Sequence, residues 1–246
     1  MQEGANMNLD PGMIAFNALL SAKTPPEAVT WPLEKQRTAW NAVCKQFSAP
    51  RPAGLTVSNL EFEGVKFRLY VPDGAKPQAG VLYFHGGGWV LGGPETHDDM
   101  CAEMAAGAGC VLALVDYRLA PEHVHPAQRE DALKVWRWLR ENVSENVVAA
   151  GDSAGGQMSA GLALHLKAQG LPQLKAMILI YPGLGADFEL PSYMRNADAP
   201  SLSRADMIYY LTSFLGPEGN PNWRDETALP NLAQDVSGVL KPFFSK

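Results

Sequence analysis

Short runs of apolar residues recur through the middle of the chain, about 30 residues apart. Residues with helical spacing of apolar positions fill the gaps between four such runs, which are Val81–Phe84, Val111–Val115, Val147–Ala150 and Ala176–Tyr181. Continuous apolar strands that alternate with helices are typical of βαβ units in a parallel sheet buried on both faces. The pattern therefore predicts a doubly wound α/β fold in which Ala176–Tyr181 is an interior strand.

The N-terminal part of the chain has a different pattern. Asp10-Pro11 is a suitable N-cap and first-turn pair for a helix, and a second helix is expected from Leu33 to Phe47. The segment from Ser48 to Gly54 contains two prolines and a glycine and is interpreted as a linker. Lys66–Val71 then alternates polar and apolar residues, as a half-exposed strand does.

Helix signals also occur between and after the apolar runs. Thr96 is a candidate cap for a helix that ends near Gly107, and Pro126 can occupy the first turn of a helix that ends near Asn142. Between Pro182 and Pro230 the strand rhythm stops, and Ser203 begins a capped helix. This helix is interpreted as part of a lid over the C-terminal edge of the sheet; the alternative is an ordinary crossover helix.

These patterns divide the chain into four expected segments. Residues 1–50 form N-terminal cap helices and residues 51–185 the α/β core. Residues 186–225 form a second cap segment, and residues 226–246 begin a final core segment that is cut short.

Composition narrows the classes of function. The chain has 246 residues, a formal net charge of −6 and no basic patch, which argues against nucleic acid as a partner. Its three cysteines have no metal-binding spacing, and reduced thiols in a cytoplasmic protein are the expectation. The N-terminus lacks the features of a signal peptide, and no apolar run reaches the roughly 18 residues of a membrane span.

Ser153 lies between an expected strand and an expected helix, with Gly151 and Gly155 two positions away on either side. A sharp strand-to-helix turn of this kind exposes a nucleophilic serine, and the small flanking residues let the backbones approach closely. The helix N-terminus also directs positive partial charge at the serine oxygen. Alone, the motif also fits a phosphate-binding turn or a plain tight turn.

A second motif, His85-Gly86-Gly87-Gly88-Trp89, directly follows the strand Val81–Phe84. Glycines at the C-terminal edge of a sheet leave backbone N–H groups unshielded, and two of these with the N–H of Ala154 can meet the oxyanion of a tetrahedral intermediate. We interpret His85 as a residue that fixes the loop rather than as a base. The two motifs together indicate an acyl-transfer site.

These residues carry a family resemblance. His85–Trp89, Tyr117–Glu122 and Gly151–Gly156 resemble the HGGGW, YRLAPE and GDSAGG blocks of the hormone-sensitive-lipase-like esterases, which belong to the α/β-hydrolase superfamily. The resemblance implies hydrolysis of carboxylic esters with short acyl chains, without a cofactor or metal. It also implies that the N-terminal helices and the segment after Pro182 form the cap.

By the same resemblance, Ser153 is the nucleophile, and Gly87, Gly88 and Ala154 supply the oxyanion hole, with Gly86 in the same loop. Four further residues of the matching blocks are interpreted as structural. Asp152 and Arg118 are expected to be buried partners, and Tyr117 and Glu122 are expected to hold their loop.

The sequence departs from the family after the expected second cap. The family places an acid after a seventh strand and a histidine after the eighth, and neither can be assigned here. Of the five histidines, only His165 follows Ser153, and at 12 residues along the same helix it would lie about 18 Å away. His97 is expected in the first turn of its helix, and His123 and His125 are the remaining candidates for a substitute base.

Two expectations follow from this departure. Ala176–Tyr181 becomes an exposed sheet edge, which favours association with a second copy. We also expect the chain to be a truncated gene product with impaired activity, because loss of a triad member leaves only weak residual catalysis. The alternative functions are a non-catalytic binding protein for a small molecule on the same scaffold, and an amidase or deacetylase.

Overall fold

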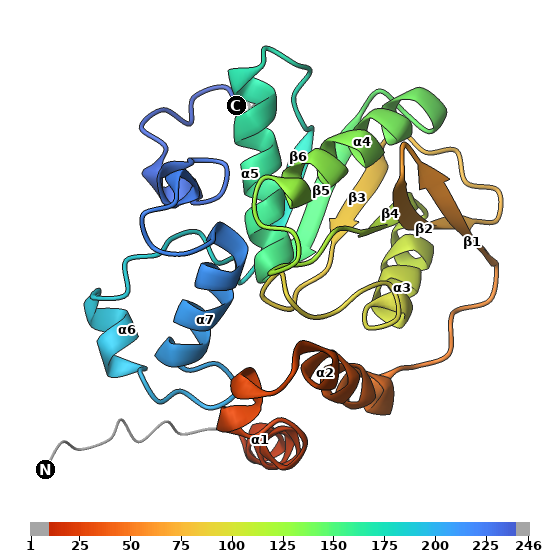
Figure 1. Ribbon diagram of the computed structural model, residues 1–246. Coiled ribbons are helices and arrows are strands. Elements are labelled where there is room, and N and C mark those ends of the chain that lie inside the picture. Colours follow the sequence, from red (N-terminus) through yellow and green to blue (C-terminus); the bar gives the residue numbers. More distant parts are fainter. Residues whose placement is uncertain (1–9, 240–246) are drawn as a thin grey trace, which may run out of the picture.

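A six-stranded sheet forms the centre of the computed structural model, which describes residues 10–239 (Figure 1). Its strands, in the spatial order β1-β2-β4-β3-β5-β6, are β1 (Leu55–Phe62), β2 (Val65–Pro72), β4 (Val111–Asp116), β3 (Gly80–Phe84), β5 (Val147–Asp152) and β6 (Ala176–Ile180). β3 to β6 run parallel, whereas β1 and β2 are antiparallel to their neighbours. The doubly wound, mostly parallel sheet expected from the sequence is therefore confirmed.

The first strand of the hairpin was not expected. β1 pairs with β2 over its whole length, and the connection is the two-residue turn Glu63-Gly64, in which both residues have positive φ angles. A two-residue turn with this backbone matches the twist of the strands it joins. The exposure of β1 side chains alternates along most of the strand, so the polar and apolar alternation of its sequence carried the missing signal.

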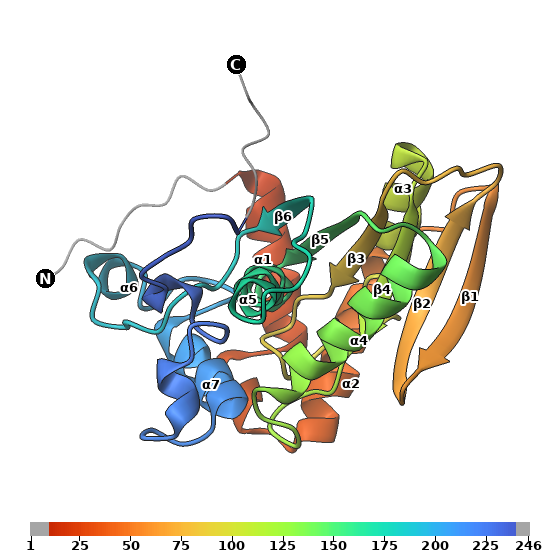
Figure 2. The ribbon, with the colours of Figure 1, turned by 90° about the horizontal axis from the view of Figure 1, so that it is seen from above.

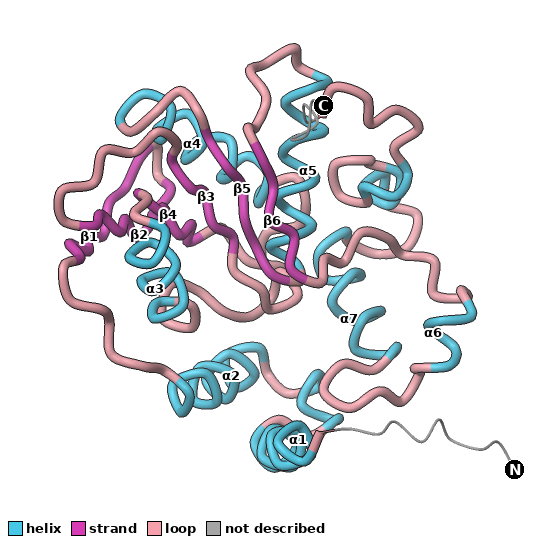
Figure 3. Tube along the Cα trace, turned by 180° about the vertical axis from the view of Figure 1, so that it is seen from behind, coloured by secondary structure: helices cyan, strands magenta, loops and turns pink. Residues whose placement is uncertain are grey.

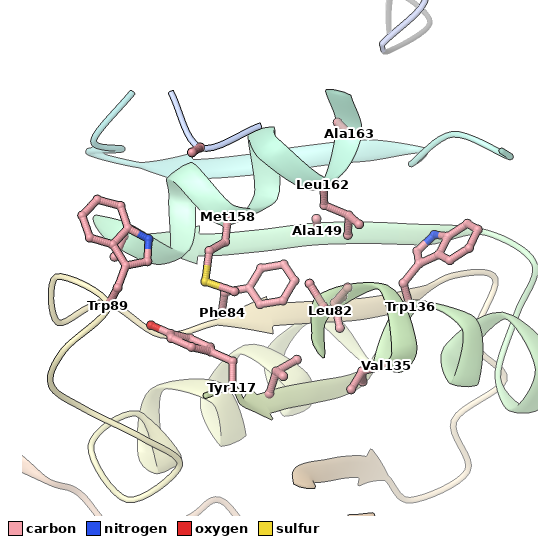
Figure 4. Close-up of a cluster of buried hydrophobic side chains, with 14 of the residues drawn as sticks. Leu82, Phe84, Trp89, Tyr117, Val135, Trp136, Ala149, Met158, Leu162 and Ala163 are labelled. Carbon is pink, nitrogen blue, oxygen red and sulfur yellow. The ribbon is translucent and has the colours of Figure 1, made fainter. Parts of the chain in front are cut away.

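Helices cover both faces of the sheet (Figures 2 and 3). On one face α3 (Asp98–Ala108) packs against a small cluster that includes Tyr70, Tyr83 and Leu112. On the other face lie α4 (Ala127–Asn142) and α5 (Ala154–Ala168). There the larger core gathers side chains from β3, β5 and both helices, including Leu82, Phe84, Ala149, Val135 and Leu162 (Figure 4).

The remaining helices gather at the end of the sheet to which the parallel strands point (Figure 1). They are α1 (Pro11–Lys23), α2 (Leu33–Phe47), α6 (Pro191–Arg195) and α7 (Arg204–Leu215), with short 3-10 turns at Pro26–Thr30, Pro221–Arg224 and Pro230–Leu232. Two of these helices have the side-chain caps that the sequence predicts: Asp10 accepts from Gly12 N–H at α1, and Ser203 forms a capping box with Asp206 at α7. This arrangement places two separate parts of the chain beside the carboxyl ends of β3 and β5.

The apolar rhythm alone places Ala176–Tyr181 in the sheet interior, but the structure shows the sheet edge that is expected where the further family strands are missing, within residues 10–239. β6 pairs with β5 along one edge only, and its other edge has no partner strand in this range. Ile178, which lies beside Ala150 of the α3-side cluster, is 47% exposed because α3 does not reach across to β6. The described sheet therefore ends in an apolar strand.

Smaller expectations are also corrected. Thr96 does not cap α3; the N-cap position is His97, which lies just before the helix rather than in its first turn. Pro126 likewise precedes α4 at its N-cap position. The three cysteines form no disulfide in the structure. None of the described helices combines the length and the apolar character needed to cross a membrane.

Candidate active site

Ser153 occupies a strained turn between β5 and α5. Its φ and ψ angles are 53° and −115°, a conformation that L-residues rarely adopt. The turn is held from the β6 side, because Ser153 N–H donates to Ile180 O at 2.9 Å and Gly183 N–H donates to Ser153 O at 3.4 Å. The hydroxyl-bearing side chain thus sits at the carboxyl edge of the sheet, at the N-terminus of a 15-residue helix.

The flanking glycines are required by close backbone contacts. A Cβ atom on Gly155 would lie 1.9 Å from Phe84 O, and one on Gly151 would lie 2.4 Å from the Gly155 carbonyl carbon. Both distances are far shorter than non-bonded atoms allow. The two glycines therefore let β5 and the first turn of α5 pack directly against the end of β3.

The motif His85–Trp89 forms a sharply turning loop after β3, which we call the glycine loop. Gly87, Gly88 and Trp89 have consecutive φ angles of 119°, 60° and 60°. Gly87 O accepts from the N–H groups of Val90, at 3.1 Å, and Leu91, at 2.8 Å. Among residues 10–239, no acceptor is found for the N–H of Gly87 or of Gly88. These are free donors on a half-buried loop.

Gly86 lies in the same loop but differs from Gly87 and Gly88 in its contacts. Its N–H donates to Asp152 Oδ1 at 3.0 Å, and a Cβ atom on it would lie 2.1 Å from Asp152 Oδ2. The N–H of Gly86 is therefore already used and is not one of the free donors of the loop. Gly86 instead fastens the glycine loop to the residue that precedes Ser153.

Asp152 is the centre of a local hydrogen-bond network. Its carboxylate accepts from Tyr83 Oη at 3.0 Å and contacts His97 Nε2 at 3.3 Å, in addition to Gly86 N–H. Burial opposes its charge, but the hydrogen bond from His97 and those from Tyr83 and Gly86 outweigh burial and lower the pKa of the carboxyl. The carboxylate is thus occupied in holding the turn, which agrees with the expected structural role.

His85 and Tyr117 support the loop from within. The two rings stack with centroids 4.2 Å apart, and Tyr117 Oη donates to His85 O at 2.8 Å. His85 is fully buried, and burial lowers its pKa to about 3. Its imidazole is therefore neutral at physiological pH and makes its contacts within the loop, as expected for a residue that fixes the loop.

Trp89 anchors the other end of the loop. Its indole Nε1 donates to Gln157 Oε1 at 3.0 Å, and its ring stacks on Phe214 of α7 at 4.3 Å (Figure 4 shows the Trp89 ring). Tyr210, also on α7, covers Gly88, where an added Cβ would lie 2.5 Å from the phenol ring. Gln157 of α5 and Phe214 and Tyr210 of α7 were not identified from the sequence, because only the fold brings these side chains beside the loop.

The histidines considered as substitute bases either bind other residues through their rings or are exposed to solvent. His125 is buried and its Nε2 contacts Asp225 Oδ2 at 2.9 Å, while His123 is exposed and its backbone N–H donates to Leu119 O. His97 binds Asp152 and Thr96 through its two ring nitrogens. Within residues 10–239, no side chain forms a hydrogen bond with Ser153 Oγ, so the structure brings no base to this serine.

The structure also places two residues of the block Tyr117–Glu122. Arg118 was expected to be buried, but its side chain is 38% exposed; it hydrogen-bonds the buried Asp131 at 3.0 Å and pairs with Glu130. Glu122 forms a bidentate ion pair with Arg37 of α2, at 2.7 and 2.9 Å. Both residues make structural contacts in the loop that follows β4.

Comparison with known proteins gives the family. A family profile described as alpha/beta hydrolase fold matches residues 81–244. Carboxylesterase NlhH of Mycobacterium tuberculosis is 40% identical over 190 residues, which cover 73% of this chain and 59% of that protein. Esterase LipI of the same organism is 42% identical over 161 residues, covering 60% of this chain and 50% of LipI. The chain thus spans between half and three-fifths of the length of these relatives.

Solved structures agree with the sequence relatives. An ester hydrolase from the metagenome of Lake Arreo, in complex with a bipyridine phosphonate derivative, has a TM-score of 0.82 at 29% identity, covering 94% of this chain and 77% of that one. An esterase from the bacterial hormone-sensitive lipase family has a TM-score of 0.79 at 27% identity, covering 92% and 75%. The chain therefore belongs to the α/β-hydrolase fold family and is similar to the hormone-sensitive-lipase-like esterases.

Proposed function

We propose that this protein hydrolyses carboxylic esters with short acyl chains through an acyl-enzyme intermediate on Ser153. The observation that supports this most strongly is the strained turn of Ser153 beside two glycine N–H groups that have no acceptor in the described residues. A hydrolase needs such donors only when charge develops on the substrate oxygen. The family resemblance and the esterase relatives support the same reaction.

In the proposed reaction, Ser153 Oγ attacks the acyl carbon and its proton passes to a general base. The carbonyl oxygen becomes an oxyanion, which accepts hydrogen bonds from Gly87, Gly88 and Ala154. Ala154 is the first residue of α5, so its N–H has no intrahelical acceptor. The C–O bond to the alcohol then breaks, the alcohol leaves with a proton, and water hydrolyses the acyl-serine.

We further propose that the 246 residues alone perform this reaction slowly. All five histidines lie in the described residues, and none hydrogen-bonds Ser153. Removal of a triad member in serine proteases leaves about 10³- to 10⁴-fold catalysis over water. The same scale is expected for ester hydrolysis by this chain.

The test is covalent trapping rather than turnover. A p-nitrophenyl alkylphosphonate loses p-nitrophenolate when a serine oxygen attacks phosphorus, which leaves a stable phosphonyl ester. In imidazole buffer, which supplies a base, mass spectrometry is expected to find one adduct per chain on the peptide that contains Ser153. Ser153→Ala should carry none; an adduct that persists in this variant, or no adduct in the parent chain, would overturn the proposal.

The second candidate is a non-catalytic binding protein for a small molecule on the same scaffold. The observation that favours it is the absence of a base hydrogen-bonded to Ser153 among residues 10–239. It predicts saturable binding of an ester that is neither hydrolysed nor attached to the protein. An adduct on Ser153 in the trapping experiment decides against it.

An amidase or deacetylase reaction would use the same site. Arylacetamide deacetylase of Oryctolagus cuniculus is 37% identical over 176 residues, covering 65% of this chain and 44% of that protein. Parallel assays with an ester and the corresponding anilide separate the two reactions. Faster release from the ester is expected.

The remaining assignments are also proposals. We propose that residues 1–50 and 186–225 act as the cap, residues 51–185 as the core and residues 226–246 as the start of a further core segment, in a cytoplasmic protein. Its partner is a small ester, with no nucleic acid and no cofactor. A second copy of the chain is the proposed partner of the open edge of β6.

A further inference from the structure

Arg37, on the second turn of α2, reaches two loops of the core at once. Its Nε donates to Val90 O at 2.9 Å, and its Nη2 donates to Ala120 O at 3.2 Å. The same guanidinium forms the bidentate ion pair with Glu122. One side chain from the N-terminal helices thus binds the segment after the glycine loop and the loop after β4.

The contact with Val90 acts on the peptide group that carries a proposed oxyanion donor. The C=O of Gly87 and the N–H of Gly88 belong to one planar peptide unit, so the direction of one fixes the direction of the other. Val90 N–H and Leu91 N–H both donate to Gly87 O and so set that plane. Arg37 binds Val90 O, which belongs to the same planar peptide unit as the Leu91 N–H. Through this unit the guanidinium acts on the Gly87 carbonyl.

The contact with Ala120 acts on the neighbouring peptide group. Ala120 N–H donates to Trp89 O at 2.9 Å, and Arg37 binds Ala120 O. Two consecutive peptide groups after Trp89 are therefore tied to the same guanidinium, one directly through Val90 O and one through Ala120. Trp89 itself has a positive φ angle, a conformation that a non-glycine residue keeps only when its surroundings hold it.

The ion pair strengthens this attachment. The Arg37 side chain is 26% exposed, so its charge is partly removed from water and requires a partner. The hydrogen bond from Arg37 lowers the pKa of the Glu122 carboxyl, which keeps it charged at neutral pH. A guanidinium can serve three acceptors in fixed directions, whereas a lysine ammonium at the same place is a single point charge.

A neighbouring residue links α2 to the other helix beside the loop. Gln36 Nε2 donates to Tyr209 Oη of α7 at 3.0 Å, and Tyr210 of α7 is the residue that covers Gly88. Two consecutive residues of α2 therefore contact the surroundings of the glycine loop: Gln36 binds α7, and Arg37 binds the backbone at Val90 and Ala120.

We propose that Arg37 is a positioning residue for ester hydrolysis: it holds the Val90 end of the glycine loop so that Gly88 N–H stays directed at the developing oxyanion. This inference rests on the proposed function of the loop. Its structural part, the restraint of the loop by α2, is measurable without turnover.

The test compares Arg37→Ala and Arg37→Lys with Arg137→Ala. Arg137 of α4 forms a more exposed ion pair, with Glu63 in the β1–β2 turn at 2.6 Å, and is the control for loss of an arginine that does not contact the glycine loop. Amide hydrogen exchange of Val90, Leu91 and Ala120 is followed by NMR. Loss of a charged hydrogen bond is expected to speed exchange by about tenfold in both Arg37 variants and to leave it unchanged in Arg137→Ala. The lysine variant keeps the charge and long stem, so it serves if the alanine variant does not fold.

The second readout is the Ser153-dependent hydrolysis of p-nitrophenyl butyrate in imidazole buffer. We expect kcat to fall about tenfold in both Arg37 variants with KM unchanged, because the loop donors act on the transition state. Unchanged exchange overturns the inference. Faster exchange with kcat equal to that of Arg137→Ala overturns the positioning role. If the parent chain and Ser153→Ala hydrolyse the ester equally, the proposed function fails, and exchange still reports whether Arg37 restrains the loop.

Discussion

Backbone contacts leave no room for side chains at the turn that carries Ser153. Added Cβ atoms on Gly151 and Gly155 would meet backbone atoms, which explains why glycines flank the serine at this spacing. Gly86 is restricted by a side chain instead. Its role depends on where the Asp152 side chain points, and that is set by Tyr83 and His97, which come from different elements.

The first prediction concerns Gly155, one of the two glycines that flank Ser153. Gly155→Ala places a methyl group 1.9 Å from Phe84 O, a backbone atom that cannot move aside without shifting β3. We expect a loss of about 3 kcal/mol or more in the free energy of unfolding. Urea denaturation followed by circular dichroism measures it.

The matched control for this change is Gly107→Ala within α3, where nothing lies within 4 Å of the added methyl group. Here alanine should stabilise the chain by about 0.5–1 kcal/mol through helix propensity. Equal effects of the two substitutions would contradict the packing argument.

At the scale of elements, local signals placed most helices. Caps at Asp10 and Ser203 mark helices that the structure contains, and α2 has the expected bounds. Where such local signals were lacking, the prediction failed: β1 was not expected, and the cap of α3 was assigned one residue too early. Asp225, in the segment after α7, contacts His125 and Arg129 at the start of α4, about 100 positions earlier in the chain. The periodicity of the sequence does not predict such a contact.

The second prediction concerns that contact. Asp225 accepts from Arg129 Nη1 at 3.2 Å and contacts the buried His125 at 2.9 Å. Burial opposes its charge, but hydrogen bonds from His125 and Thr227 outweigh burial and lower the pKa of the carboxyl. Asp225→Asn is expected to lower the free energy of unfolding by about 1–3 kcal/mol at pH 7. Asp198→Asn, at an exposed position, should change it by less than about 0.5 kcal/mol.

The pH dependence of this effect has a defined sign. Because the pKa of Asp225 is lower in the folded state, its stabilisation is present above the unfolded pKa, about 4, and is lost as pH falls through the folded pKa. Urea denaturation at a series of pH values should therefore show the gap between the parent chain and Asp225→Asn narrowing below about pH 4. A gap that widens in acid would contradict the assigned ion pair.

At the scale of the whole molecule, the βαβ rhythm predicted the parallel sheet and its two covered faces. The rhythm alone does not show which strand lies at the edge, because a strand of continuous apolar residues has the same pattern whether or not a neighbour pairs with it. The edge at β6 was expected from the departure from the family pattern instead. The site lies where the fold class directs ligands, at the carboxyl ends of β3 and β5. The covering of Gly88 by α7 was beyond sequence patterns, since it depends on the packing of a distant helix.

The third prediction concerns the edge of β6. Ile178 is 47% exposed beside an edge that has no partner strand in residues 10–239. We expect the chain to associate as its concentration rises, because such edges pair readily with another chain. Ile178→Lys should reduce this association in sedimentation velocity experiments, and Leu171→Lys, at a 37% exposed position off the sheet, should not. An equal effect of the two lysines would indicate that charge alone governs association.

The measurement that tests the central claim most directly is the dependence of p-nitrophenyl butyrate hydrolysis on imidazole concentration, for the parent chain and for Ser153→Ala. Imidazole supplies the base that no histidine provides to Ser153 in residues 10–239. We predict slow hydrolysis without imidazole. We also predict that the rate for the parent chain rises with imidazole well above the rate for Ser153→Ala. Equal rates for the two proteins at every imidazole concentration would contradict the assignment of Ser153 as the nucleophile.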